Sequence, residues 1–174
     1  MNAEKLSRTS SFFSVASLVI AAIMLIALVA VIVTGIAIVA NDGLMNLIAE
    51  EIAPGTFVKN DIYIVMAIAL LCLPFIAFMF FLAYRLFRNI SISRTPFSTD
   101  NVRILKLISY IMLIFAIPVT MIAEALYVLY SSWGSTTLQL GGGLPLVFVA
   151  VLFYFMAYVF EYGAALQKES DETL

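Results

Sequence analysis

Four long apolar runs constrain this chain more than any other feature of its sequence. The first, Phe12–Ala40, has no charged residue in 29 positions. The hydrocarbon core of a bilayer is about 30 Å thick and takes roughly 20 apolar residues in helical form. Each run is therefore long enough for one spanning helix and too short for two. The sequence predicts an all-α polytopic membrane protein with four transmembrane helices in a single domain, residues 1–174, with spans at about 12–40, 62–86, 105–130 and 144–166.

The composition favours a membrane location and excludes several classes of function. Hydrophobic residues make up 64% of the chain and charged residues 11%, against roughly 45–50% and 25% in soluble domains. With 9 Lys and Arg against 11 Asp and Glu, no basic surface for direct nucleic-acid binding is expected. The chain has no histidine and one cysteine, Cys72, which excludes histidine-based metal or acid–base sites and an internal disulfide. The first run is about twice as long as a signal-peptide apolar region, so we expect it to remain a helix.

The distribution of basic residues predicts how the spans are oriented. Lysine and arginine accumulate in the cytoplasmic segments of membrane proteins. If the four runs cross the bilayer in turn, eight basic residues fall on one side and only Lys59 on the other. We therefore expect both termini and the middle loop to be cytoplasmic and the protein to lie in the cell inner membrane. The eight are Lys5, Arg8, Arg85, Arg88, Arg94, Arg103, Lys106 and Lys168.

The middle loop reads as a structured turn. Pro96 disfavours helical geometry at the residue before it. Ser98 or Thr99 can then cap the third helix, with Asp100 favourable in its first turn. We expect a built connection here and not a flexible linker.

Prolines and acids inside the apolar runs leave two interpretations open. Pro74 and Pro118 are either packing kinks or hinges around a cavity. Glu124 and Glu161 are intramembrane carboxylates, which are candidates for function, but their positions place them near opposite faces of the bilayer. Arg85 lies at a depth similar to that of Glu161 and can pair with it. We favour structural or interfacial roles for both acids over a transport site.

Two segments carry a family resemblance. Leu86–Ile90 with Thr95–Leu105 contains a Pro-Phe, Ser/Thr and Asp-Asn-Val sequence, and Phe160–Leu174 contains Phe-x-x-Gly-Ala-x-Leu followed by an acidic stretch with Asp-x-Thr. Both resemble the YoaS-like bacterial membrane proteins, domain-of-unknown-function family 2975. Where members often carry basic residues between the Phe and the Gly, this chain has Glu161 and Tyr162. That departure weakens any family-wide role for Glu161.

The resemblance implies a four-helix inner-membrane protein with no assigned enzymatic activity, and we expect a non-enzymatic function. From the residues themselves we expect no cofactor and no bound metal. Genes of this family often neighbour one for a small helix-turn-helix regulator, which implies a regulatory or sensory membrane partner of that cytoplasmic transcription regulator. The alternative is a small transporter or channel component, and a homo-oligomer stays open in either case. No catalytic residue is expected. The partner-binding candidates are Pro96, Phe97, Asp100, Asn101, Arg103, Gly163 and Asp171, and the intramembrane polar candidates are Arg85, Glu124 and Glu161.

Overall fold

A computed structural model describes residues 3–41, 43, 47, 59–130 and 143–172. It does not describe the side chains of residues 3, 59–61, 117–120, 123–124, 126–130, 143–144 and 171. The described part of the chain consists mainly of four helices. They are α1 (Ala3–Ala40), α3 (Lys59–Ser93), α4 (Thr99–Tyr130) and α5 (Gly143–Glu172). In this part of the chain the regular structure is entirely helical, as the apolar runs predict.

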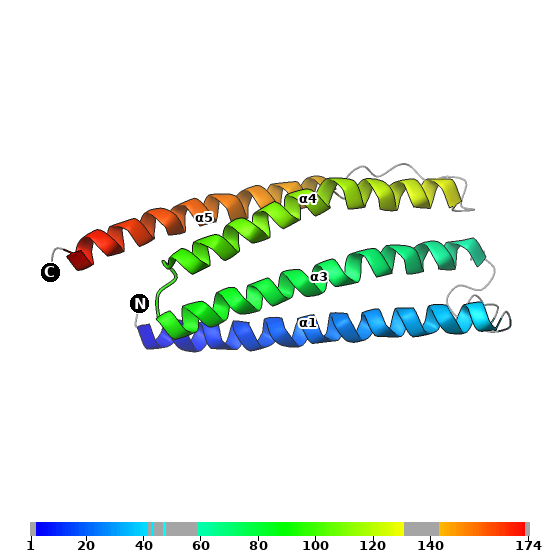
Figure 1. Cartoon of the computed structure of the whole chain (residues 1–174), viewed down its shortest axis with the longest axis horizontal. Helices are drawn as coiled ribbons and strands as arrows, with labels where there is room; N and C mark the ends of the chain where they lie inside the picture. Colours follow the sequence, from blue (N-terminus) through cyan, green and yellow to red (C-terminus); the bar gives the residue numbers. More distant parts are fainter. Residues whose placement is uncertain (1–2, 42, 44–46, 48–58, 131–142, 173–174) are drawn as a thin grey trace.

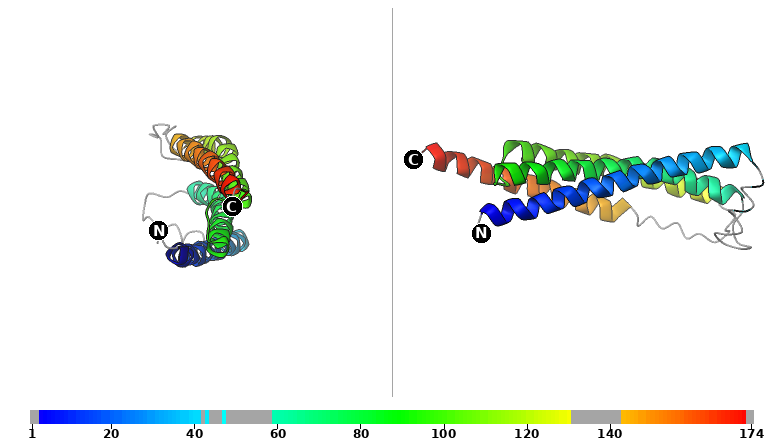
Figure 2. Two further views of the ribbon diagram at one scale, coloured as in Figure 1. Left: turned by 90° about the vertical axis from the view of Figure 1, so that its left-hand side faces the viewer. Right: turned by 90° about the horizontal axis from the view of Figure 1, so that it is seen from below.

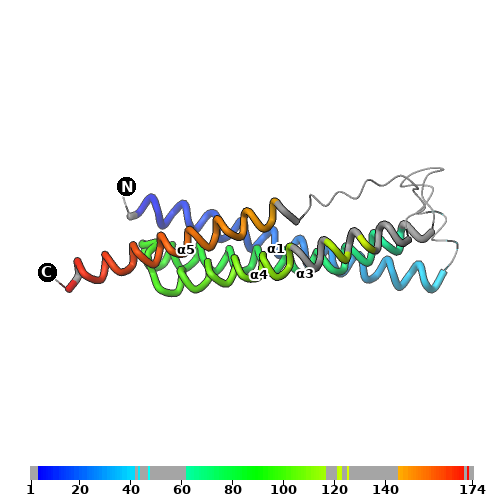
Figure 3. Tube along the Cα trace, turned by 90° about the horizontal axis from the view of Figure 1, so that it is seen from above, coloured from blue at the N-terminus to red at the C-terminus, as the bar shows by residue number. Residues whose placement is uncertain are grey.

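The four helices run along one long axis (Figures 1 and 3). The start of α1, the end of α3, the start of α4 and the end of α5 lie together at one end of the molecule (Figure 1). This end, the basic end, carries the eight basic residues that define the predicted orientation. These segments therefore share one end of the molecule.

The helices extend well beyond the apolar runs. Among the four, the shortest has 30 residues and the longest has 38. With a rise of about 1.5 Å per residue, such helices are about 45 Å to about 57 Å long, against about 30 Å for the hydrocarbon core. The helix α3, for example, continues past Arg85 and Arg88 to Ser93. The sequence-based spans mark where the chain is apolar, whereas a helix continues into water until a residue stops it.

Each helix packs only against its neighbours in sequence. Among the described residues, α1 contacts α3, α3 contacts α4 and α4 contacts α5, and no other pair of helices approaches closely. The end-on view in Figure 2 shows the result, an open curved row instead of a closed bundle. The molecule is thus two helical hairpins, α1–α3 and α4–α5, joined through the smaller α3–α4 contact.

A shared apolar core joins the two hairpins in the half of the molecule near the basic end. Buried residues recur on α4 at helical spacing, which directs one face of this helix inward. The core cluster combines them with residues of α3 and α5: Leu82, Leu86, Ile90, Ile104, Leu105, Ile108, Met112, Ala150 and Ala157. Further along, the rings of Phe75 on α3 and Phe115 on α4 stack with centroids 3.5 Å apart.

Small residues let the paired helices approach closely. Ser109 on α4 is fully buried, and its hydroxyl donates a 2.8 Å hydrogen bond to the carbonyl oxygen of Ala150 on α5. On α1, Ser10, Ser14 and Ser17 are buried at helical spacing. Small residues of this kind are typical of helix contacts in membranes. The hydrophobic effect does not drive helices together there, because lipid tails are as apolar as the helix surfaces.

Most of the remaining surface is apolar. Large side chains such as Val39 and Ile114 are more than 70% exposed. Among the described residues, three helical segments are long and apolar enough to cross a membrane: Glu4–Ala40, Ile62–Ser93 and Pro145–Ser170. In the most apolar window of each, only 11% of the helix is buried within the molecule. An apolar surface of this extent requires lipid around it, so the chain is a membrane protein.

Candidate functional site

The loop between α3 and α4 is a compact turn at the basic end. Arg94 follows the last residue of α3 with a positive φ of 56°. Its backbone N–H donates to the carbonyl of Ile90 at 3.0 Å, which ends the helix in the left-handed conformation usual for this position. Pro96 follows two residues later and prevents the helix from resuming.

Ser98 is the N-cap of α4, one of the two caps that the sequence predicts. Its hydroxyl accepts a hydrogen bond from the backbone N–H of Asn101 at 3.2 Å. Its carbonyl accepts the first helical bond, from the N–H of Val102 at 3.1 Å. Asp100 lies in the first turn, as predicted, where a negative charge suits the helix dipole.

Asn101 anchors this turn from beneath. Its side chain is fully buried, and the side-chain amide nitrogen donates to the carbonyl of Pro96 at 3.1 Å. The side-chain oxygen is buried without a hydrogen-bond partner. Burying a side-chain amide whose oxygen has no hydrogen-bond partner costs free energy. The presence of Asn101 here therefore indicates that the turn must keep a single conformation.

Phe97 joins the turn to α5. Its ring packs edge-on against Phe160, with centroids 5.5 Å apart. It also lies directly over Gly163: a Cβ atom added there would lie 2.5 Å from Cδ1 of Phe97, closer than real Cβ contacts. Gly163 is therefore required by the ring above it. Two residues from separate family-like segments meet in this contact, which we call the Phe97 clasp (Phe97, Phe160 and Gly163).

A second, polar contact supports the clasp. The hydroxyl of Thr95 donates to the side-chain oxygen of Gln167 on α5 at 3.1 Å. The same hydroxyl oxygen accepts a 3.2 Å hydrogen bond from the backbone N–H of Phe97. The loop and the last turns of α5 are thus held as one unit.

Glu161 pairs with Lys106 and not with Arg85, which corrects the pairing suggested by depth alone. The Lys106 Nζ atom lies 2.9 Å from Glu161 Oε2 and donates a hydrogen bond to it. Arg85 lies exposed on α3, and α3 does not approach α5 closely in the described residues. The depth of Arg85 is suitable, but the open row of helices separates it from Glu161.

Of the remaining candidates, two have described side chains and two do not. Asp100 and Arg103 are exposed and lie 4.0 Å apart, one turn apart on α4. The side chains of Glu124 and Asp171 are outside the described residues, although both positions lie within helices. The sequence did not identify Lys106, Phe160, Thr95 or Gln167 as residues of the candidate site. A charged residue at the start of an apolar run, as Lys106 is, was the available signal.

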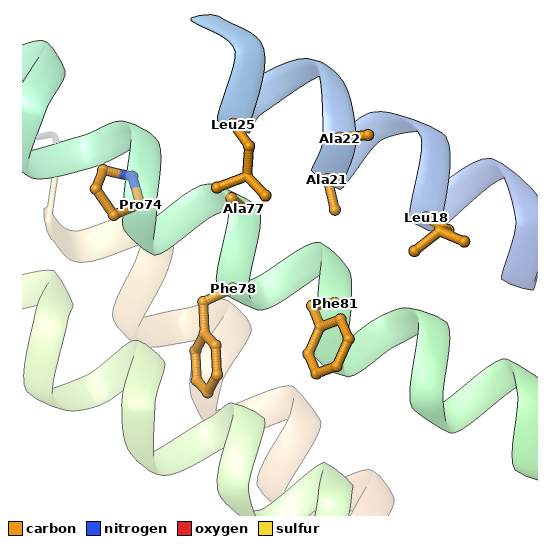
Figure 4. A pocket seen from close by; sticks show the side chains of 8 residues that line it. All are labelled: Leu18, Ala21, Ala22, Leu25, Pro74, Ala77, Phe78 and Phe81. Atoms are coloured by element: carbon orange, nitrogen blue, oxygen red, sulfur yellow. The ribbon is translucent and has the colours of Figure 1, made fainter. Parts of the chain in front are cut away.

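A purely apolar hollow of about 360 Å³ separates α1 from α3 near Pro74 (Figure 4). The short side chains of Ala21, Ala22 and Ala77 leave this space open between the two helices. None of its lining residues carries a titratable or hydrogen-bonding side chain. The hollow therefore has no groups for catalysis or for binding a polar ligand.

In the part of the chain that the structure describes, no group of His, Cys, Asp or Glu could hold a metal ion.

Comparison with known proteins adds one assignment. Residues 58–174, two thirds of the chain, match the family described as protein of unknown function (DUF2975). The chain belongs to this family. The match includes α3, α4, α5 and the Phe97 clasp, while α1 lies before it. The narrower YoaS-like grouping stays a prediction. No curated protein and no solved structure matches the chain.

Proposed function

We propose that the chain crosses the inner membrane four times, with both termini and the α3–α4 loop in the cytoplasm. The support is the gathering of eight of the nine basic residues at one end of the molecule. The crossing proposed in addition to the three apolar segments of α1, α3 and α5 is α4, which runs antiparallel to α3 and pairs with α5.

Cysteine labelling tests this orientation. In a Cys72→Ala background, single cysteines replace Arg94, Lys168 or Lys59, and intact cells are treated with a membrane-impermeant maleimide. We expect labelling at position 59 alone, and labelling at 94 and 168 only after the membrane is opened. Labelling of position 94 or 168 in intact cells would contradict the proposed topology.

We further propose a non-enzymatic regulatory or sensory function in which the basic end binds a cytoplasmic protein. The observation that carries this proposal is the Phe97 clasp, because it unites the two segments that resemble the family into one surface. Asp100 and Arg103 follow Phe97 in the first turns of α4, and their side chains are exposed. The partner that the family resemblance implies is a small helix-turn-helix transcription regulator.

The geometry gives a transporter less support. A transport site needs polar groups that are accessible within the membrane. Glu161 is instead held by Lys106 near the basic end, and the hollow beside Pro74 is wholly apolar.

Affinity capture from the native host tests the proposed partner. The full chain, a chain without residues 168–174, and Phe97→Ala are solubilised and captured in parallel. Phe87→Ala is the matched control, since Phe87 packs against Phe13 near the same end with centroids 5.4 Å apart but belongs to the other hairpin. We expect a helix-turn-helix protein with the full chain and Phe87→Ala, and at least a tenfold loss with Phe97→Ala and the truncated chain. Equal recovery with all four, or no such protein with any, would refute the proposal.

A further inference from the structure

A groove of about 470 Å³ opens between the start of α4 and the end of α5. Three of its lining side chains are cationic and one is anionic, and the volume falls in the range of small-ligand sites. The groove does not include Phe97 or Gly163. Its lining residues are Thr99, Val102, Arg103, Lys106, Glu161, Ala164, Ala165 and Lys168.

Tyrosines mark the depth of this groove in the membrane. Tyr158 lies beside Lys106, with the ammonium nitrogen 5.5 Å from the ring centroid. Tyr154 packs against both Tyr158 and Tyr110, with centroids 5.3 and 5.8 Å apart. Tyr162 is 69% exposed. Tyrosine gathers at the headgroup level of a bilayer, where its ring meets lipid and its hydroxyl meets water. The groove therefore lies at the depth of lipid phosphates.

The charges of the groove favour an anion. Lys106 is neutralised by Glu161, but Arg103 and Lys168 have weak partners on their own helices. Arg103 lies 4.0 Å from Asp100 and Lys168 lies 3.7 Å from Glu172, and all four side chains are at least 66% exposed. Exposed pairs of this kind contribute little, so both cations can turn to a phosphate. Basic pockets between transmembrane helices bind anionic headgroups in the same way.

We propose that this groove binds the phosphate of an anionic membrane lipid. Arg103 and Lys168 contact the phosphate oxygens, and Lys106 neutralises the Glu161 carboxylate, which would otherwise repel the phosphate. The apolar lining of Val102, Ala164 and Ala165 suits the start of the lipid tails and distinguishes a lipid from free phosphate. The proposal rests on the groove and not on the Phe97 clasp, although Arg103 also belongs to the surface proposed to bind the protein partner.

Binding of short-chain phosphatidylglycerol to the full chain in neutral detergent, followed by native mass spectrometry, tests the proposal. Phosphatidylcholine of equal chain length and inorganic phosphate serve as the other probes. We expect phosphatidylglycerol to bind at least about fivefold more tightly than either, the effect of about one surface charge. Equal affinity for phosphatidylcholine, or full displacement by equimolar inorganic phosphate, would overturn the assignment to an anionic lipid.

Charge variants show whether the groove is the site. Arg103→Gln and Lys106→Gln should each weaken phosphatidylglycerol binding about fivefold, whereas Glu161→Gln should strengthen it by a similar factor. Lys106→Gln and Glu161→Gln break the same ion pair, so a merely structural effect would have the same sign in both. Arg88→Gln is the matched control, since Arg88 lies near the same end on α3 but outside the groove. Shifts of the same sign at positions 106 and 161, or an equal loss with Arg88→Gln, would overturn the proposal.

Discussion

The two hairpins of this protein are held together by different kinds of contact. The α4–α5 hairpin has an aromatic ring over a glycine, a buried hydroxyl bonded to a backbone carbonyl and an ion pair between helices. The α1–α3 hairpin relies on small buried residues along its length and on hydrogen bonds between Ser7 and Ser91 at the basic end. Specific contacts at α4–α5 allow one arrangement, whereas small-residue packing tolerates adjustment. Substitutions at matched positions should expose this difference.

The largest expected effect is at Asn101. Asn101→Asp removes the donor to the Pro96 carbonyl and places a buried carboxylate beside it, so we expect a loss of about 3 kcal/mol of unfolding free energy at pH 7. Unfolding in mixed detergent micelles measures this loss. It should shrink at pH 5, where protonation restores an O–H donor. Asn89→Asp on α3, the control in the other hairpin, should lose less than about 1 kcal/mol, the usual cost of an acid near a helix C-terminus. Equal losses at both positions would contradict the anchoring role of Asn101.

The two close-packed glycines give the next comparison. Gly163→Ala forces a methyl group against the Phe97 ring, three atoms of which lie between 2.5 and 3.0 Å from the added Cβ. We expect this variant to lose about 2 kcal/mol in the same assay. At Gly35 the atom in the way, 2.7 Å from an added Cβ, is the flexible end of Met66. Gly35→Ala should therefore lose less than about 1 kcal/mol, because a methionine side chain adapts easily. The reverse order would show that the α1–α3 hairpin is the more tightly specified one.

The hydroxyl contacts should differ by less. Ser109→Ala removes a fully buried hydrogen bond and should lose about 1 kcal/mol. Ser91→Ala should lose about half as much or less, since its contact is only partly buried and the bond from Ser7 to the Ser91 carbonyl is kept. Thermal unfolding of both variants side by side decides the order, and a larger loss with Ser91→Ala would contradict it.

The smallest effect is expected from the ion pair. The Lys106 and Glu161 side chains are 30% and 53% exposed. In a double-mutant cycle with Lys106→Gln and Glu161→Gln, the coupling energy should therefore be below about 1 kcal/mol. A coupling energy well above this value would show that the pair is a structural determinant of the hairpin. In that case lipid binding by these two variants would also reflect the changed structure of the hairpin, and the Arg103→Gln variant alone would test the groove.

Local sequence signals predicted the elements and the turn between them. The apolar runs located the helices, and Pro96, Ser98 and Asp100 predicted how α4 begins, because each acts within a few residues of its own position. The partner of Glu161 could not be predicted in the same way. Depth along a helix follows from counting residues, but the direction in which a side chain projects depends on which helices are neighbours. The open row determines this, and no local signal encodes it.

The Phe97 clasp lies between these cases. Both of its segments stand out in the sequence, yet their contact joins Phe97, in the α3–α4 loop, to Gly163 on α5, far apart along the chain. The pattern showed that a glycine was notable without showing which ring required it. The clasp therefore became evident only with the helices in place.

The row of helices has a consequence for biosynthesis. Because each helix contacts only the one before and the one after it, every packing surface in the described structure becomes available as soon as the next helix has been inserted. No described helix has to wait for one beyond its neighbour in the row, and contacts between neighbouring elements favour rapid assembly. The first hairpin can assemble while the second is still being translated, and the Phe97 clasp can close only after Gly163 has left the ribosome.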